Sequence, residues 1–229
     1  MTAANPRKKT TVKTTESPVL TRRGQQRQEV LLAVAAEHFL SHGYQGSSLD
    51  AIIAQAGGSK GAIYRHFNGK EGLFSAVVEQ LCYEFLTDLR AIDVRECALP
   101  DGLRMVLLEL VHVLAQPRHA AFYRLIVAGS AQFPDAGKTW YEHGPARWFD
   151  VLMQLFNHQR EQGIVTSDIP IEHIARILFD AVLSNLTTQF VILGKPIEVE
   201  ETTPLIEELI SMTQARFAVR SANAGLAPP

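Results

Sequence analysis

Apolar residues recur at three- and four-residue steps along most of this 229-residue chain, which is the pattern of amphipathic α-helices. The first such segment runs from Gln26 to His42, and further ones begin at Ser48, Ser59 and Asn68. Serine and asparagine are favoured at helix N-termini, and glycines separate the segments. No segment alternates apolar and polar residues as a half-buried strand does. The sequence therefore predicts an all-α protein of about nine helices.

Prolines and glycines divide the second half of the chain into further helical segments. Proline is favoured in the first turn of a helix, where its missing N–H removes no hydrogen bond. These residues predict helices over 100–115, 117–131, 134–162, 171–193 and 204–218. Gly144-Pro145 is a point at which the third of these can break.

The composition is that of a globular protein whose charge is unevenly distributed. Hydrophobic residues make up 46% of the chain, and its longest apolar runs are too short and too polar to span a bilayer. The formal net charge is −2 overall, but it is +4 before residue 81 and −6 after it. A basic front on an acidic body is typical of a DNA-binding head joined to a domain that does not bind DNA.

The segment from Tyr44 to Phe74 has the organisation of a helix-turn-helix. A short apolar helix capped by Ser48 is followed by a glycine pair, a second short helix capped by Ser59, and the start of a long helix. Glycines permit the sharp turn, and the second helix is short because only its first turns reach base edges in the DNA major groove. The segment therefore predicts a DNA-binding unit.

The polar residues of this unit are candidates for DNA contacts. Hydroxyl and imidazole groups suit phosphate oxygens, lysine suits a phosphate or a guanine edge, and small residues let the backbone approach the DNA. Lys70 stands in the first turn of the long helix, where free N–H groups and the helix dipole already favour an anion. The predicted DNA-binding residues are Ser47, Ser48, Ser59, Lys60, Gly61, Ala62, Tyr64, Arg65, His66 and Lys70.

Residues 27–74 resemble the DNA-binding domain of the tetracycline-repressor (TetR) family. The positions that match its pattern in register are Phe39, Gly43, Tyr44, Ser47, Ser48, Ala56, Gly57, Ser59, Lys60, Gly61, Ile63, Tyr64, His66, Phe67, Lys70, Glu71 and Leu73. Gly58 departs from the pattern, because the family usually has valine there, and the change removes a packing contact and adds flexibility to the turn. The segment 122–134, with Gly144-Pro145-Ala146, is similar to a C-terminal subtype found in autoinducer and efflux regulators of that family.

The resemblance implies a homodimer that binds a palindromic DNA operator through its head and a small-molecule inducer through its body. We expect a flexible basic arm at 1–22, the helix-turn-helix domain at 23–70, a helical regulatory and dimerisation domain at 71–220, and a disordered tail at 221–229. The arm would add salt-dependent affinity that is independent of DNA sequence. The expected function is a transcriptional repressor released by a hydrophobic inducer, with efflux or catabolic genes as the targets that the resemblance suggests.

A ligand pocket between helices needs apolar walls and a few polar groups. The candidate ligand-binding residues are Phe85, His112, Phe122, Trp140, Trp148, Phe149, Met153, Asn185, Gln189 and Phe190. Ordinary core packing is the competing interpretation for each of them. His112, Asn185 and Gln189 stand out because a polar group on an apolar helix face needs a partner.

The last two predicted helices have apolar faces wider than one helical layer can cover. Paired with their two-fold copies, they would form a four-helix dimer interface. The predicted interface residues are Ile174, Ile177, Leu178, Ala181, Val182, Leu186, Leu205, Leu209 and Met212. In such a dimer each protomer presents one recognition helix, residues 60–66, to the DNA. An inducer that tilts the helix beginning at Lys70 would then change the spacing of the two recognition helices on the DNA.

Other classes of function find less support in the sequence. No nucleotide-binding or hydrolase fingerprint occurs, so we expect neither an enzyme nor a cofactor. His38 and His42 are four apart on a helix, but no carboxylate or cysteine joins them at a spacing suited to a metal. Cys82 and Cys97 are the only cysteines, which fits a cytoplasmic protein and leaves a thiol redox sensor as an alternative. An activator, or a general DNA-binding protein without an inducer, also remains open.

Overall fold

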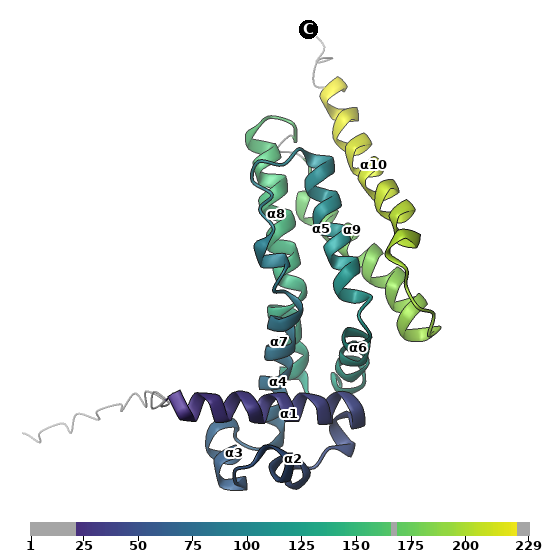
Figure 1. The fold of residues 1–229 in the computed structure, drawn as a ribbon. Helices are drawn as coiled ribbons and strands as arrows, with labels where there is room; N and C mark the ends of the chain where they lie inside the picture. Colours follow the sequence, from purple (N-terminus) through teal and green to yellow (C-terminus); the bar gives the residue numbers. More distant parts are fainter. Residues whose placement is uncertain (1–21, 166–168, 224–229) are drawn as a thin grey trace, which may run out of the picture.

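The computed structural model describes residues 22–165 and 169–223, with side chains as far as Phe217. Within these ranges every regular element is helical, which confirms the predicted fold class (Figure 1). The elements are α1 (Arg22–Gly46), α2 (Leu49–Ala56), α3 (Lys60–Phe67), α4 (Lys70–Phe85), the 3-10 turn η1 (Leu89–Ala91), α5 (Leu99–Leu114), α6 (Pro117–Gly129), α7 (Pro134–His143), α8 (Pro145–Glu161), α9 (Ile171–Leu186), the π-helical η2 (Thr187–Ile192) and α10 (Val199–Asn223).

Helices α1 to α3 form a small head at one end of the molecule (Figure 1). Ser48 and Ser59 cap α2 and α3 by accepting hydrogen bonds from the Ala51 and Ala62 amides, at 3.1 and 3.2 Å. Between these helices the backbone has φ values of 75° at Gly57 and 115° at Gly58. Glycine adopts both values without strain, so the turn formed in this chain uses the conformational freedom of both residues.

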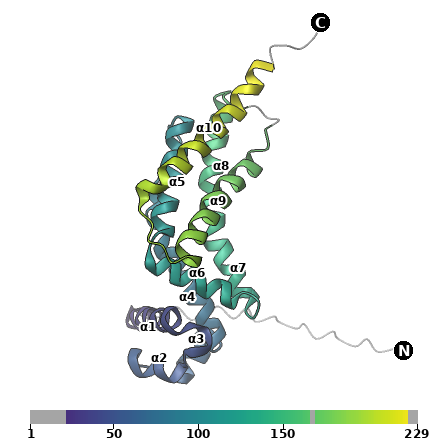
Figure 2. The same ribbon diagram turned by 90° about the vertical axis from the view of Figure 1, so that its right-hand side faces the viewer.

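The remaining helices form an elongated body that α4 enters from the head. Helix α4 packs against α1 and α7, while α5 packs against α8, α9 and α10. Helix α10 runs along the outside of α5, and its last turn lies at the end of the molecule opposite the head (Figure 2). A continuous apolar core joins the head to the body, with Phe39, Phe74 and Phe156 among its fully buried side chains.

Several helix boundaries differ from those predicted. The stretch 134–162 is divided at Gly144, and the predicted helix 171–193 changes to π-helical spacing at Thr187. Helix α10 begins at Val199 instead of at Pro204, because a turn carrying Glu200 and Glu201 precedes the proline and suits the positive end of the helix dipole. It continues to Asn223, so the first three residues of the predicted disordered tail are helical. The predicted basic arm, apart from its last residue, and the remainder of that tail lie outside the described residues.

Gly72 allows α4 to begin close against the end of α3. A Cβ at this position would overlap the backbone carbonyl oxygen of Phe67, whereas a Cβ on Gly61 has only the Ser59 hydroxyl oxygen nearby, at 3.9 Å. We expect Gly72→Ala to destabilise the protein by about 1–3 kcal/mol, because forced overlap in a packed region displaces backbone. Gly61→Ala should leave the stability unchanged or slightly raised, because alanine favours helix. Urea unfolding of both variants checks this, and equal stabilities would contradict it.

Candidate DNA-binding surface and ligand cavity

Most of the predicted DNA-contact residues lie on the outer surface of the head. Ser48, Ser59, Lys60, Gly61, Tyr64, Arg65 and His66 are all exposed. Ile63 and Phe67 face the opposite way and are buried, so α3 is anchored by its apolar side and presents its polar side outward. This is the arrangement by which a short recognition helix can enter a DNA groove.

Lys60 is paired with a carboxylate that the sequence analysis did not single out. Its Nζ lies 2.8 Å from an Asp50 carboxylate oxygen, and both side chains are largely exposed. The hydrogen bond from Lys60 to Asp50 raises the pKa of Lys60. Since the pair links α2 to α3 and stays in contact with water, it can open when a phosphate approaches.

Lys70 lies where the head meets the body. Its Nζ is 4.3 Å from the centre of the Tyr44 ring, a cation–π contact that positions the charge at the first residue of α4. Partial burial lowers the pKa of Lys70. Tyr44 matched the family pattern in the sequence, but only the structure shows that it supports this lysine.

The structure corrects the prediction for Ser47. This side chain is buried, and its hydroxyl lies 2.9 Å from the His38 carbonyl oxygen and 2.8 Å from that of Gly43. Ser47 therefore closes the end of α1 and has no hydroxyl to offer to DNA. Ala62 and His66 border a groove of about 250 Å³ between α1 and α3, together with Arg27.

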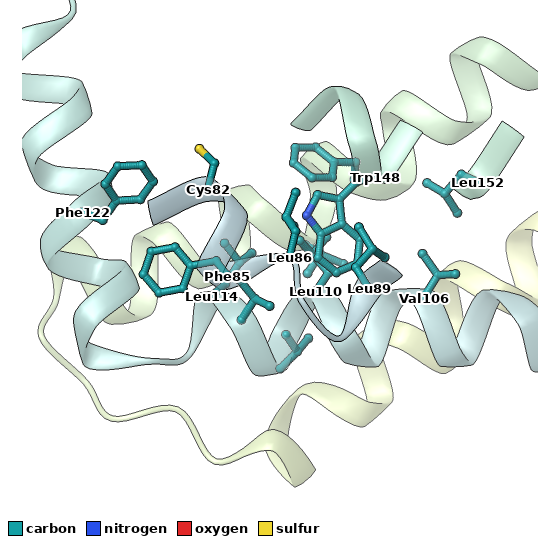
Figure 3. Packing of buried hydrophobic residues seen from close by; sticks show 14 of the residues in the cluster. Cys82, Phe85, Leu86, Leu89, Val106, Leu110, Leu114, Phe122, Trp148 and Leu152 are labelled. Carbon is teal, nitrogen blue, oxygen red and sulfur yellow. The ribbon is translucent and has the colours of Figure 1, made fainter. Parts of the chain in front are cut away.

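A small apolar cavity lies inside the body and is lined by residues of α4 to α9. Its volume is about 30 Å³, which holds about two water molecules. Figure 3 shows several of these side chains, among them Phe85, Leu110 and Trp148, within the buried apolar packing of the body. The lining residues are Cys82, Phe85, Leu86, Leu110, Val113, Leu114, His119, Phe122, Trp140, Gly144, Pro145, Trp148, Phe179 and Leu183.

Four of the ten predicted ligand-binding residues, Phe85, Phe122, Trp140 and Trp148, line this cavity. The other six do not, and two of them are clear corrections. His112 is on the exposed side of α5, with Nδ1 3.7 Å from a Glu109 oxygen, and Asn185 is exposed on α9. Both residues lie on the sides of their helices that face solvent, away from the cavity. Phe149, Met153, Gln189 and Phe190 are half-buried elsewhere.

His119 is the polar residue of the cavity that the sequence analysis missed. It is buried, and its ring meets those of Phe85 and Phe122 edge to face, with centroids 4.9 and 6.0 Å away. Burial lowers the pKa of His119 to about 4, so the imidazole is neutral at pH 7. Its position in the first turn of a helix, beside Arg118, gave no signal of burial.

The predicted dimer interface divides into buried and exposed residues. Leu178, Val182, Leu186 and Leu209 are buried within the protomer, so they belong to its core and not to an outer surface. The reason is that α9 packs against α5 and α8, and α10 packs against α5. Ile177 and Met212 are 62% and 60% exposed, and Ile174, Ala181 and Leu205 are half-buried.

The alternative chemistries gain little from the geometry. Cys82 is buried, and burial raises its pKa to about 12, which keeps the thiol protonated and unreactive. His38 donates from Nε2 to the Gln55 side-chain oxygen at 2.9 Å, and the described residues contain no cluster of three metal-binding side chains. No described helix is long and apolar enough to cross a membrane.

Comparison with known proteins agrees with this architecture. Residues 31–77 match the model of bacterial regulatory proteins of the tetR family, and the chain belongs to that family of transcription regulators, which are not enzymes. Its C-terminal part, residues 101–219, matches the AefR-like transcriptional repressor C-terminal domain. The chain is thus a DNA-binding transcriptional regulator with an AefR-like body.

Individual relatives extend over most of the chain. The transcriptional repressor AcnR of Corynebacterium diphtheriae is 25% identical over 82% of this chain and 93% of its own. A TetR-family regulator from Mesorhizobium loti has a similar structure, with a TM-score of 0.71, 25% identity, and coverage of 87% of this chain and 98% of its own. The flavonoid-responsive regulator FrrA follows, with a TM-score of 0.64, 27% identity, and coverage of 84% and 95%.

The low pKa of His119 has a consequence for stability. The unfolded chain takes up a proton on this residue near pH 6.5, but the folded protein does so only near pH 4. The folded state therefore loses stability as the pH falls between these values, by up to about 3 kcal/mol. We expect His119→Leu to remove this part of the pH dependence in urea unfolding measured from pH 7 to pH 4. If the free energy of unfolding fell equally with pH in the wild type and in His119→Leu, the low pKa assigned to His119 would be contradicted.

Proposed function

We propose that the protein is a homodimeric repressor that binds a palindromic operator and releases it when a hydrophobic small molecule enters the body cavity. The observation that carries this proposal is the course of α4. Its first residue, Lys70, lies where the head meets the body, and Cys82 and Phe85 near its other end line the cavity. At 1.5 Å per residue these ends are about 22 Å apart on one continuous helix.

The head supports the proposed contact with DNA. Lys60, Tyr64 and Arg65 point outward from α3, Lys70 flanks them, and the caps Ser48 and Ser59 stand at the two helix N-termini. Phosphate contacts from such groups position a head, while base contacts from the recognition helix select a sequence. Repression is favoured over activation because the C-terminal domain matched is that of a repressor and AcnR is named as one.

The cavity supports a hydrophobic inducer. Its walls are aromatic and aliphatic, and the neutral imidazole of His119 can exchange a hydrogen bond with one polar group of a ligand. At about 30 Å³ the cavity is far smaller than a typical ligand pocket. A ligand must therefore select a state in which the body helices have moved apart, and α4 is one of them. FrrA, described as flavonoid-responsive, is an example of a relative that responds to a small molecule.

The exposed apolar residues of α9 and α10 support a dimer. Ile177 and Met212 are large, apolar and mostly exposed in the single chain. Two-fold pairing would bury them and place two heads on one face, about 34–36 Å apart if they engage successive major grooves.

Genomic DNA fragments captured by the purified protein and sequenced test the operator. We expect enrichment of one palindromic site by the wild type. Lys70→Gln should weaken binding to that site and reduce the slope of log affinity against log salt by about one, because one phosphate contact is lost. The control is Lys138→Gln, which removes an exposed lysine of α7 paired with Glu142. Diffuse enrichment without a palindrome, or an equal loss in both variants, would contradict the proposal.

The dimer is tested by placing charge at its predicted centre. We expect Ile177→Lys and Met212→Lys to shift the protein toward monomer in analytical ultracentrifugation, because a lysine cannot be buried there without a partner. The matched control is Val127→Lys, at an apolar residue of α6 that is 58% exposed. A wild type that sediments as a monomer, or variants that remain dimeric, would refute the assigned interface.

A further inference from the structure

A second cleft lies at the junction of the head and the body. It has a volume of about 430 Å³ and lies between the end of α1, one side of α6 and the turn before α7. It shares no lining residue with the body cavity. Helix α6 separates the two, because His119 and Phe122 face the cavity whereas Ala121, Arg124 and Ala128 face the cleft.

The walls of this junction cleft combine aromatic and polar surfaces. Phe39, Tyr44 and Phe133 form an aromatic part, with the Tyr44 and Phe133 rings 4.0 Å apart between centroids. At its polar side the Gln45 side-chain amide donates to the Gln132 side-chain oxygen at 2.8 Å, which links the head to the body. Such a mixture of apolar walls with a few polar groups is typical of small-molecule sites.

The charge at the cleft is positive. Arg124 lines it, and none of its lining residues is aspartate or glutamate. Arg124 donates one hydrogen bond, from Nη2 to the Val191 carbonyl oxygen at 3.2 Å, and within the described part of the chain it forms no ion pair. Arg118 on the same helix is different, because the carboxylates of Glu37 and Glu84 neutralise it.

We propose that the junction cleft is a second effector site that binds a small aromatic carboxylate. The ring lies against Tyr44 and Phe133, and the carboxylate accepts charge-assisted hydrogen bonds from Arg124. A volume of about 430 Å³ is within the range of ligand pockets and admits a fused two-ring compound. The bound molecule would contact both α1 and α6 and so bridge the head and the body.

Calorimetric titration of the DNA-free protein with naphthoate, and with its uncharged amide naphthamide, tests this site. We expect naphthoate to bind the wild type saturably. Naphthoate should bind the Arg124→Gln variant about tenfold or more weakly, and naphthamide should bind the wild type about tenfold or more weakly than naphthoate does. In each case one partner of the charged contact is missing. Ala128→Phe keeps Arg124 but fills the cleft and should also weaken binding. Arg147→Gln is the control, since it removes an exposed arginine on α8 that pairs with Asp150.

Val113→Leu separates this site from the body cavity. It narrows the cavity by one methylene at a residue that does not touch the cleft, so naphthoate should bind as it does to the wild type. Unsaturable binding at millimolar naphthoate, equal binding of naphthamide, or affinity that falls with Val113→Leu but not with Arg124→Gln would overturn the proposal. Because no DNA is present, these outcomes are independent of whether the protein is a repressor.

Discussion

A cluster of four aromatic rings packs the head against the body, in addition to the Gln45–Gln132 hydrogen bond and the Arg118–Glu37 ion pair. Phe39 and Tyr44 come from the end of α1, Phe74 from α4 and Phe133 from the turn before α7, with neighbouring centroids 4.0 to 5.9 Å apart. Three of them are buried, and edge-to-face contacts add to the free energy of burying them. A movement of α1 relative to α4 and the turn before α7 must therefore slide or open this cluster.

The cluster also links three features that differ in chemistry. Tyr44 carries the ammonium group of Lys70 on one ring face, Phe74 belongs to the helix that reaches the body cavity, and Phe133 forms a wall of the junction cleft. The body cavity is apolar with one neutral imidazole, whereas the cleft presents an unneutralised arginine. Two sites of such different character would select different ligands and act on the same joint.

The head was largely predictable from the sequence because its constraints are local. Serine caps, a glycine pair and inward-facing Ile63 and Phe67 determine the arrangement of short helices, and the structure has all of them. Ser47 escaped this logic because its partners, the His38 and Gly43 carbonyls, become available only where α1 breaks. Ser47, which is buried, and Ser48, which caps α2, are the same residue type at adjacent positions, so the sequence alone does not distinguish their roles.

The body was less predictable because its helices are apolar on wide faces. Periodicity shows which side of α9 is apolar, but it does not show which part of that side packs against α5 and α8 and which part remains at the surface. Leu178 and Ile177 are neighbours in sequence, yet one is buried and the other mostly exposed. The same limit explains why His119 was missed and His112 was wrongly placed in the pocket, since burial there depends on the angle between helices.

The small size of the body cavity sets the energetics of any regulation through it. A cavity of about 30 Å³ must grow roughly tenfold to reach the volume of a typical ligand pocket. The proposed ligand would thus bind only to an expanded state, and its measured affinity would be reduced in proportion to the fraction of molecules in that state. If DNA favours the compact state, operator and ligand oppose each other by the same coupling free energy, because linkage is reciprocal. Under this proposal, the buried aromatic residues that keep the cavity small would determine how much ligand is needed to release the DNA.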